Sequence, residues 1–111
     1  MPQGIGKIKI RLPRTIRKGQ VVAVKTLITH PMETGYRTDK ETKKKIPAFY
    51  INDVSVYYGN DLISRADWTM AVSTNPFMTF YLKADKTAPL KIVWKDIKGG
   101  VYEKTVQIQP Q

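Results

Sequence analysis

The stretch Lys7-Ile8-Lys9-Ile10-Arg11-Leu12 alternates strictly between cations and aliphatic residues. Successive side chains of a β-strand point to opposite faces, so a strand here would carry its aliphatic residues on one face and its cations on the other. Pro13 ends the pattern, because proline has no N–H to offer to a neighbouring strand. The stretch therefore predicts a strand with one face toward a core and one basic face toward solvent.

The same period of two returns along the rest of the chain. It predicts further strands at 21–29, 49–58, 61–66, 77–84, 90–95 and 101–109. Gly59-Asn60 is a two-residue hairpin signal between two of them. About seven short strands with turns roughly every 8–12 residues are typical of a β-sandwich. With no helical apolar stripe, the chain is expected to be an all-β, immunoglobulin-like sandwich of about seven antiparallel strands without a disulfide.

The core of this sandwich can also be outlined. Segment 21–29 is apolar on both faces for part of its length, which favours a central strand covered on both sides at one end. Leu90, Ile92 and Trp94 fall on one face of segment 90–95. The largest expected core residues are aromatic: Trp68, Trp94, Phe49, Phe77 and Phe80.

Length and composition limit the classes of protein. A chain of 111 residues with 41% hydrophobic residues fits one folded domain spanning 1–111, with residues 1–5 expected to be mobile. The chain has no cysteine, which excludes zinc–thiolate sites, iron–sulfur clusters and a thiol nucleophile of its own. No apolar run is long enough for a membrane span or a secretory signal. Composition alone therefore favours the cytoplasm and no membrane partner.

Charge points to acidic partners. There are 19 Lys and Arg against 9 Asp and Glu, a formal net charge of +10, which favours nucleic acid, an anionic membrane or an acidic protein. Tyr36, Tyr57, Tyr58 and Tyr102 could stack on bases if they are exposed. No RNA-recognition or cold-shock signature accompanies them, so nucleic-acid binding is kept as an alternative.

The segment 30–47 is a long polar connection with no apolar period. Connections of this length are uncommon in compact domains and often carry function. The run Lys43, Lys44 and Lys45 lies in it and fits either a solvated loop face or an electrostatic docking patch for acidic partners.

Catalytic constellations are missing. His30 is the single histidine, and the serines at 55, 64 and 73 do not lie in a Gly-x-Ser-x-Gly elbow. His30 before Pro31 is best interpreted as a structural residue at the end of a strand. The residue types favour a binding protein over an enzyme.

Metal binding is not indicated either. His30, Glu33, Asp39 and Glu41 lack the spacing of zinc or calcium motifs, and lysines are interleaved with them. No cofactor or metal is expected.

Several segments together resemble one family. They are Lys7 to Pro13, His30-Pro31-Met32-Glu33-Thr34-Gly35, Ala66-Asp67-Trp68, Ser73-x-Asn75-Pro76-Phe77-x-x-Phe80-Tyr81, and Trp94 followed by Asp96 and Gly99-Gly100-Val101-Tyr102. Over about residues 6–108 the pattern resembles SoxZ, a subunit of the bacterial thiosulfate-oxidising Sox system. Residues 37–45 are richer in lysine than that pattern.

The resemblance implies a role. SoxZ-like proteins are the non-catalytic half of a heterodimer with SoxY, whose C-terminal cysteine carries sulfur intermediates between the Sox enzymes. It also implies a periplasmic location, with export on the signal of the partner. The partner would supply the thiol that this chain lacks.

Residue roles follow from the resemblance as expectations. Partner binding is expected from His30, Pro31, Met32, Glu33, Thr34, Gly35, Asn75, Pro76 and Phe77. From the charge of the run, and not from the resemblance, Lys43, Lys44 and Lys45 are expected to assist the transient docking of other Sox enzymes. The alternatives are a basic nucleic-acid-binding sandwich and an accessory domain that binds a different protein.

Overall fold

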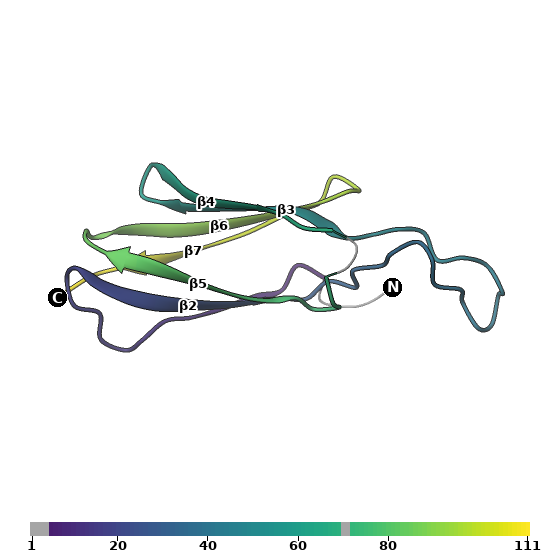
Figure 1. Cartoon of the computed structure of the whole chain (residues 1–111), viewed down its shortest axis with the longest axis horizontal. Coiled ribbons are helices and arrows are strands. Elements are labelled where there is room, and N and C mark those ends of the chain that lie inside the picture. The colour runs from purple at the N-terminus through teal and green to yellow at the C-terminus, as the bar shows by residue number, and fades with distance from the viewer. Residues whose placement is uncertain (1–4, 70–71) are drawn as a thin grey trace.

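Two β-sheets pack face to face in the computed structural model, which describes residues 5–69 and 72–111 (Figure 1). One sheet has the strand order β1-β2-β5 and the other β4-β3-β6-β7, with every pair antiparallel. The strands are β1 Ile8–Arg11, β2 Gln20–Ile28, β3 Ile51–Tyr58, β4 Asp61–Asp67, β5 Phe77–Ala84, β6 Ala88–Asp96 and β7 Val101–Ile108. The predicted all-β sandwich of seven antiparallel strands is confirmed.

Strand β1 has the orientation that its sequence predicts. Ile8 and Ile10 pack against the core, while Lys9 and Arg11 are exposed. Antiparallel pairing places Lys9 opposite Leu27 on β2. The alternation of the sequence therefore sets which face of β1 is basic.

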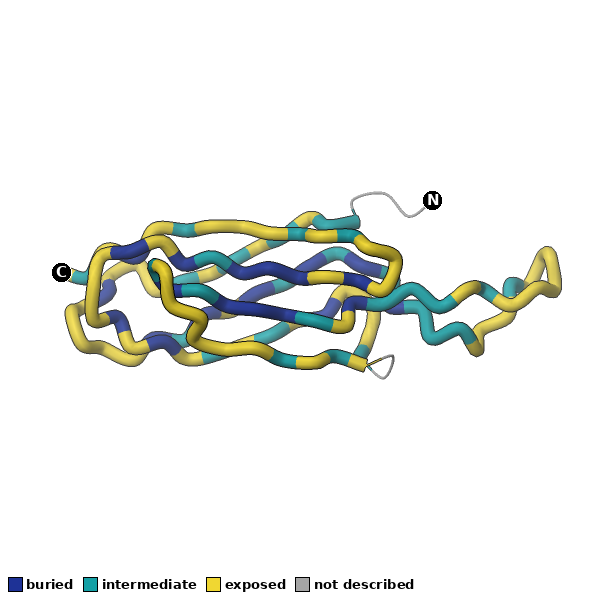
Figure 2. Tube along the Cα trace, turned by 90° about the horizontal axis from the view of Figure 1, so that it is seen from above, coloured by how far each residue is buried: buried dark blue, intermediate teal, exposed yellow. Residues whose placement is uncertain are grey.

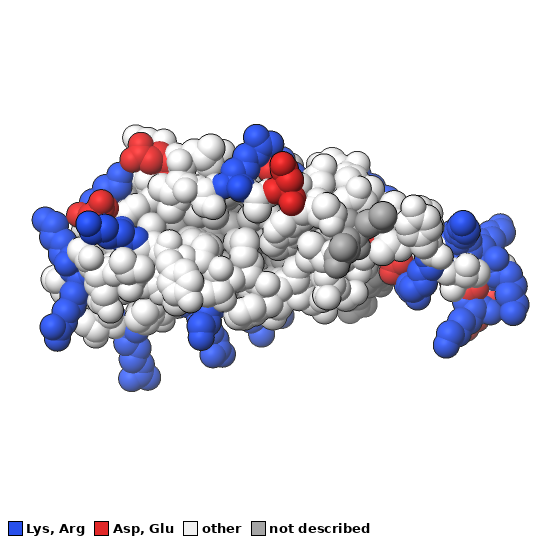
Figure 3. Space-filling view, in the orientation of Figure 1, with Lys and Arg blue, Asp and Glu red and all other residues white. Residues whose placement is uncertain are grey.

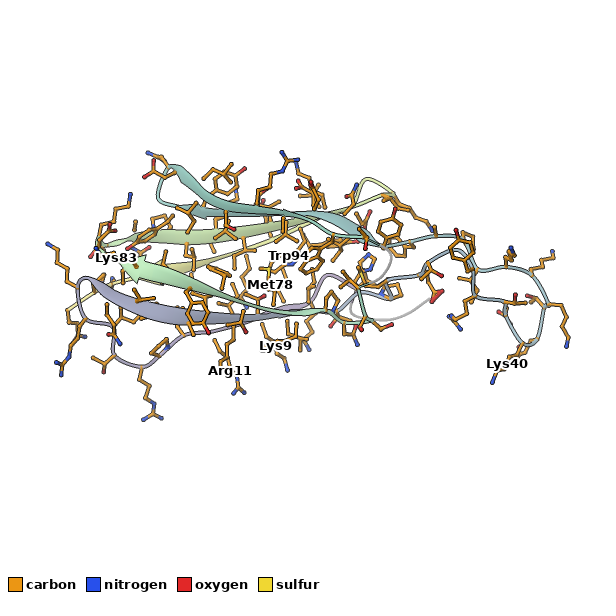
Figure 4. All side chains as sticks on the ribbon, in the orientation of Figure 1. Lys9, Arg11, Lys40, Met78, Lys83 and Trp94 are labelled. Atoms are coloured by element: carbon orange, nitrogen blue, oxygen red, sulfur yellow. The ribbon has the colours of Figure 1, made fainter. Side chains whose placement is uncertain are left out.

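The core fills the space between the sheets. The inward residues of β6 are Leu90, Ile92 and Trp94, each with no exposed surface, as their spacing predicted. Met78 and Trp94 both lie between the two layers in Figure 4. In Figure 2 the buried residues run along the strands of the sandwich, whereas residues 33–49 are half-buried or exposed.

Strand β2 is not covered on both sides, although the sequence predicts this for one of its ends. It lies in the middle of its sheet, but its burial alternates: Val22 and Val24 are buried, whereas Val21 is 62% exposed and Lys25 is exposed. Only one face of β2 is covered, because no third layer packs on its sheet. The apolar outer residues of β2 therefore face solvent in this chain.

The aromatic core predictions are correct only in part. Trp94 is fully buried, but Phe77 is 64% exposed, so its assignment to the core was wrong. Phe77 and Met78 are neighbours on β5 and point to opposite faces, and Met78 takes the inward position. Phe49, Phe80 and Trp68 are half-buried at the margins of the core.

The long connection 30–47 is more ordered than a loop. Glu33 and Phe49 exchange two backbone hydrogen bonds of 2.6 and 2.9 Å, and Thr38 forms a second isolated bridge with Lys45. Residues 33–49 thus form an irregular two-stranded arm. The arm extends beyond the end of both sheets (Figures 1 and 2), in a molecule measuring 56 × 23 × 19 Å.

One sequence prediction falls partly outside the described residues. The expected mobility concerned residues 1–5, of which 1–4 are not described, while Ile5 is half-buried. Strand β4 ends at Asp67, and residues 70–71 in the connection that follows it are not described.

Candidate functional site

The segments that carried the family resemblance converge at the end of the sandwich where the arm begins. The backbone N–H of His30 donates to Asn75 Oδ1 at 3.0 Å, and the N–H of Asn75 donates to the carbonyl of His30 at 2.8 Å. Thr74 Oγ1 donates to the carbonyl of Pro31 at 3.0 Å. Residues 30–31 and 74–75 are thereby held side by side.

His30 occupies the centre of this end. Its side chain is fully buried, with the Phe49 ring 4.4 Å away and the Tyr102 ring edge-on at 5.9 Å. Nδ1 accepts the backbone N–H of Met32 at 3.1 Å, so that nitrogen carries no proton. The proton therefore lies on Nε2, which is 3.4 Å from Asp96 Oδ2.

The carboxylate of Asp96 completes a buried polar cluster. Oδ2 accepts the hydroxyl of Tyr102 at 2.5 Å. Oδ1 accepts the backbone N–H groups of Lys98 and Gly100 at 2.9 and 2.8 Å. Asp96 is only 5% exposed, and these donors replace the water that it loses on burial.

The titration of the cluster follows from this geometry. Burial lowers the pKa of His30, and the hydrogen bond and charge of Asp96 offset this only in part. Burial acts to raise the pKa of Asp96, but its hydrogen bonds together outweigh burial, so the pKa lies below its ordinary value. Burial and the bond to Asp96 raise the pKa of Tyr102 to about 12. At neutral pH the cluster holds a neutral histidine, a carboxylate and a protonated tyrosine.

The hydrogen bonds of this cluster indicate a structural role. A histidine–aspartate pair can serve a nucleophile only if the second ring nitrogen is free to accept its proton. In this chain the backbone of Met32 occupies that nitrogen. Within residues 5–69 and 72–111, no group of three or more His, Asp or Glu residues is placed to hold a metal ion.

The backbone around His30 is tightly specified. Met32 and Asn75 both have positive φ, 52° and 51°, a region that side-chain-bearing residues seldom adopt. The sulfur of Met32 accepts the N–H of Ile51 at 3.3 Å, and Met32 is only 4% exposed. The cluster thus fixes how the arm leaves the sandwich.

The predicted partner-binding residues differ in exposure. His30, Met32 and Pro76 are buried, so a partner could reach them only through their neighbours. Pro31, Glu33, Thr34 and Gly35 are half-buried, whereas Asn75 and Phe77 are exposed. Their roles in partner binding stay predictions.

The arm carries the predicted docking lysines at its outer part. Lys43, Lys44 and Lys45 are exposed, and Lys43 adopts a positive φ of 63° in the turn. Asp39 Oδ1 stabilises this turn by accepting the N–H of Glu41 at 2.8 Å. Lys and Arg side chains gather at the far end of the arm in Figure 3, with acidic atoms among them.

The sequence did not predict that His30 would contact Asp96 and Tyr102. Asp96 is 66 residues away from His30 and pairs with it only because β6 and the arm meet at one end. A local signal did exist: the aspartate of Asp96-Ile97-Lys98-Gly99-Gly100 can accept the N–H groups of the turn that follows it. No local signal identifies the histidine partner.

The described residues contain no helix that could cross a membrane.

Four tyrosine rings were candidates for base stacking, but Tyr58 is buried and Tyr57 and Tyr102 are half-buried. Of the four tyrosines, only Tyr36 is freely exposed, at 71%.

Solved structures with the same fold span several functions. A putative superoxide reductase from Thermotoga maritima is 16% identical, with a TM-score of 0.69 over 94% of this chain and 85% of its own. The superoxide reductase (neelaredoxin) from Ignicoccus hospitalis is 17% identical, with a TM-score of 0.66 over 94% of this chain and 80% of its own. These similarities show the fold alone.

A third similar structure is the sulfur carrier protein SoxY from Chlorobium limicola f thiosulfatophilum. It is 14% identical, with a TM-score of 0.60 over 92% of this chain and 73% of its own. No curated protein sequence matches this chain.

The family described as "Sulphur oxidation protein SoxZ" matches residues 10–107. The match includes every segment that meets around His30, from residues 30–35 to Tyr102. The chain therefore belongs to the SoxZ family of sulphur oxidation proteins.

Proposed function

We propose that this chain is the non-catalytic subunit of a heterodimeric sulfur carrier. Its partner is a SoxY-like subunit whose C-terminal cysteine holds covalent sulfur intermediates while other Sox enzymes load, oxidise and release them. The observation that carries the proposal is the family match over residues 10–107.

Two features of the chain support this division of labour. The chain has no cysteine, so a thiol-bound intermediate has to be held by another subunit. The His30–Asp96 cluster is buried and fully engaged, which suits a rigid scaffold better than a reactive site.

The positive charge of the chain fits the cargo. Thiosulfonate groups on a carrier cysteine are anionic, and nearby cations would stabilise them and attract enzymes that carry acidic surfaces. A net charge of +10 on 111 residues supplies such a field.

The proposed location is the periplasm, where the chain would arrive with a signal-bearing partner. Cell fractionation tests this part. Recovery with the periplasmic fraction supports it, and recovery only with the cytoplasm contradicts it.

Reconstitution tests the proposed function directly. Thiosulfate consumption is measured with the other Sox proteins of the same organism plus this chain, the SoxY-like subunit, or both. Turnover only when both subunits are present supports a non-catalytic half of the carrier. Full turnover with the SoxY-like subunit alone contradicts it.

A further inference from the structure

The outer face of the β1–β2–β5 sheet combines cations with exposed apolar side chains. The apolar members are Val21, Phe77 and Tyr81, which are 62%, 64% and 72% exposed, together with the half-buried Leu27. The cations are Lys9, Arg11, Lys25 and Lys83, all exposed. These eight residues are called the basic face below.

The strand register arranges the basic face in rows. Lys9, Leu27 and Phe77 form one row, since Lys9 pairs with Leu27 and Leu27 pairs with Phe77. The next row on the same face contains Arg11 and Lys25, which lie directly opposite each other. Like charges directly opposite each other on neighbouring strands are destabilising. The isolated chain therefore keeps an unfavourable pair on a solvent-facing sheet.

No acidic residue of the three strands offsets the repulsion between Arg11 and Lys25. Strands β1, β2 and β5 contain no Asp or Glu, and none of the four cations forms an ion pair with any described residue. Figure 4 shows Lys9 and Arg11 pointing away from the sandwich on the side opposite β4. Along that side in Figure 3, Lys and Arg side chains project without acidic atoms beside them.

The opposite outer face is different. On the β4-β3-β6-β7 sheet, Arg65 pairs with Asp53 at 2.9 Å, and Lys91 lies 3.6 Å from Glu103. Two cations of that sheet are thus paired within it, whereas none of the four cations of the basic face forms an ion pair with a described residue. The basic face therefore carries the denser group of unpaired cations.

A concave site accompanies the charge. A groove of about 410 Å³ is lined by Lys9, Arg11, Lys25, Thr26, Leu27 and Phe77. Exposed aromatic side chains beside Arg are typical of the residues that dominate protein–protein binding energy. A partner residue inserted here would contact Phe77 and meet Arg11 and Lys25 together.

A second copy of this chain is a poor occupant. A two-fold symmetric contact would place the basic face against itself, so that cations would meet cations. A different chain that presents carboxylates around an apolar centre satisfies both the charge and the exposed aromatic rings.

We infer that the basic face is the docking surface for the cysteine-bearing SoxY-like subunit, whose contacting surface carries carboxylates opposite Arg11 and Lys25 and an apolar site for Phe77 and Tyr81. This inference rests on the proposed function, because the occupant is the partner proposed there. It places the body of the partner on a sheet face, while contact between residues 30–35 and the segment that carries the partner's C-terminal cysteine stays a separate prediction.

The test measures binding of the purified SoxY-like subunit of the same organism by surface plasmon resonance. Tyr81→Ala removes an aromatic contact, and Lys25→Glu reverses one charge of the unfavourable pair. Each variant has a control on the opposite sheet: Tyr57→Ala for the aromatic change and Lys95→Glu for the charge change. Far-UV circular dichroism and thermal melting verify that all four variants are folded.

The basic face predicts that Tyr81→Ala weakens binding by about 10-fold or more, as central aromatic residues of interfaces do. Lys25→Glu should slow association by about 10-fold at low salt, an effect that shrinks as salt screens the charges. Both controls should stay within about 2-fold of the original chain.

The other outcomes distinguish a failure of this inference from a failure of the proposed function. Tight binding by the original chain that neither Tyr81→Ala nor Lys25→Glu weakens overturns the inference and leaves the proposed function intact. No binding by the original chain overturns both. Binding of a 20-nucleotide oligo(dT) that Tyr81→Ala and Lys25→Glu abolish, without binding of the SoxY-like subunit, overturns both in favour of a nucleic-acid surface.

Discussion

His30 Nε2 and Asp96 Oδ2 lie 3.4 Å apart, with side chains that are 0% and 1% exposed. The pair joins the segment between β2 and the arm to the end of β6 across 66 residues of sequence. Because Tyr102 and two backbone N–H groups also donate to the carboxylate, this end of the sandwich is fixed by polar contacts as well as by packing. Substitutions of Tyr102 and His30 test the contribution of this cluster.

Replacing Tyr102 by Phe removes one hydroxyl and leaves the ring in place. A hydrogen bond to a buried charged acceptor contributes about 1.5–3 kcal/mol, so Tyr102→Phe should lower the free energy of unfolding by that amount. Urea denaturation followed by tryptophan fluorescence measures it. Tyr57→Phe is the matched control, since no side-chain hydrogen bond joins the Tyr57 hydroxyl to the described residues, and it should change stability by less than about 0.5 kcal/mol. Equal losses in both variants would contradict the role of the cluster.

The pH dependence of the free energy of unfolding should reflect the titration of His30, the single histidine of the chain. Its folded pKa lies below the ordinary 6.5. Below pH 6.5 the unfolded chain therefore binds more protons than the folded chain, and stability falls as the pH drops toward the folded pKa. Above pH 6.5 the contribution is fully present. The folded pKa of Asp96 is also lowered from 3.8, so its contribution is lost only as the pH falls below that value.

Urea unfolding at successive pH values from 7.5 to 5 measures this slope, which reaches at most about 1.4 kcal/mol per pH unit for one proton. His30→Gln, which cannot titrate, should be less stable throughout but lose the slope below pH 6.5. An unchanged slope in His30→Gln would show that other groups cause it.

Neutralising Lys43, Lys44 and Lys45 together to Gln should slow the docking of other Sox enzymes on the carrier at low salt. Three exposed charges at the end of the arm mainly affect encounter rates, and screening at higher salt should remove the difference. Stopped-flow association at two ionic strengths measures the effect. The folded stability should not change, because these side chains pack on nothing buried. An unchanged association rate at low salt would remove the docking role of the run.

A cysteine introduced at Thr34 should interfere with sulfur transfer under oxidising conditions. Thr34 is half-buried at the base of the arm, in the segment expected near the partner's carrier cysteine. A thiol there could form a mixed disulfide with that cysteine and stop turnover. Non-reducing gels should show a cross-linked pair of subunits, and thiosulfate turnover should fall. Thr105→Cys, exposed on β7, is the control and should do neither. Normal turnover with Thr34→Cys would contradict the expected proximity.

The strands could be predicted from the sequence because alternation is a local signal. Lys7 to Leu12 and Leu90 to Lys95 each encode their own inward face, and both faces are confirmed. The two-residue turn Gly59-Asn60 likewise marked the hairpin between β3 and β4 correctly. Whether a second layer covers a face is not a local property, however, and this explains the errors at Val21 and Phe77.

The candidate site could be predicted only in outline. The segments around His30, Asn75 and Asp96 were recognised as a family pattern, yet their contact depends on the order of strands in two sheets. The basic face likewise depends on register, since Arg11 and Lys25 become neighbours only when β1 pairs with β2. The position of a single cation in the sequence does not show which other cation it will lie beside in the sheet.

Native mass spectrometry of the chain purified from its own host at low salt tests the central claim most directly. The sulfur-carrier account predicts a one-to-one complex with a small protein that has a single C-terminal cysteine, in a series of masses separated by sulfur adducts. Recovery of the chain alone, or bound to nucleic acid, would contradict that account.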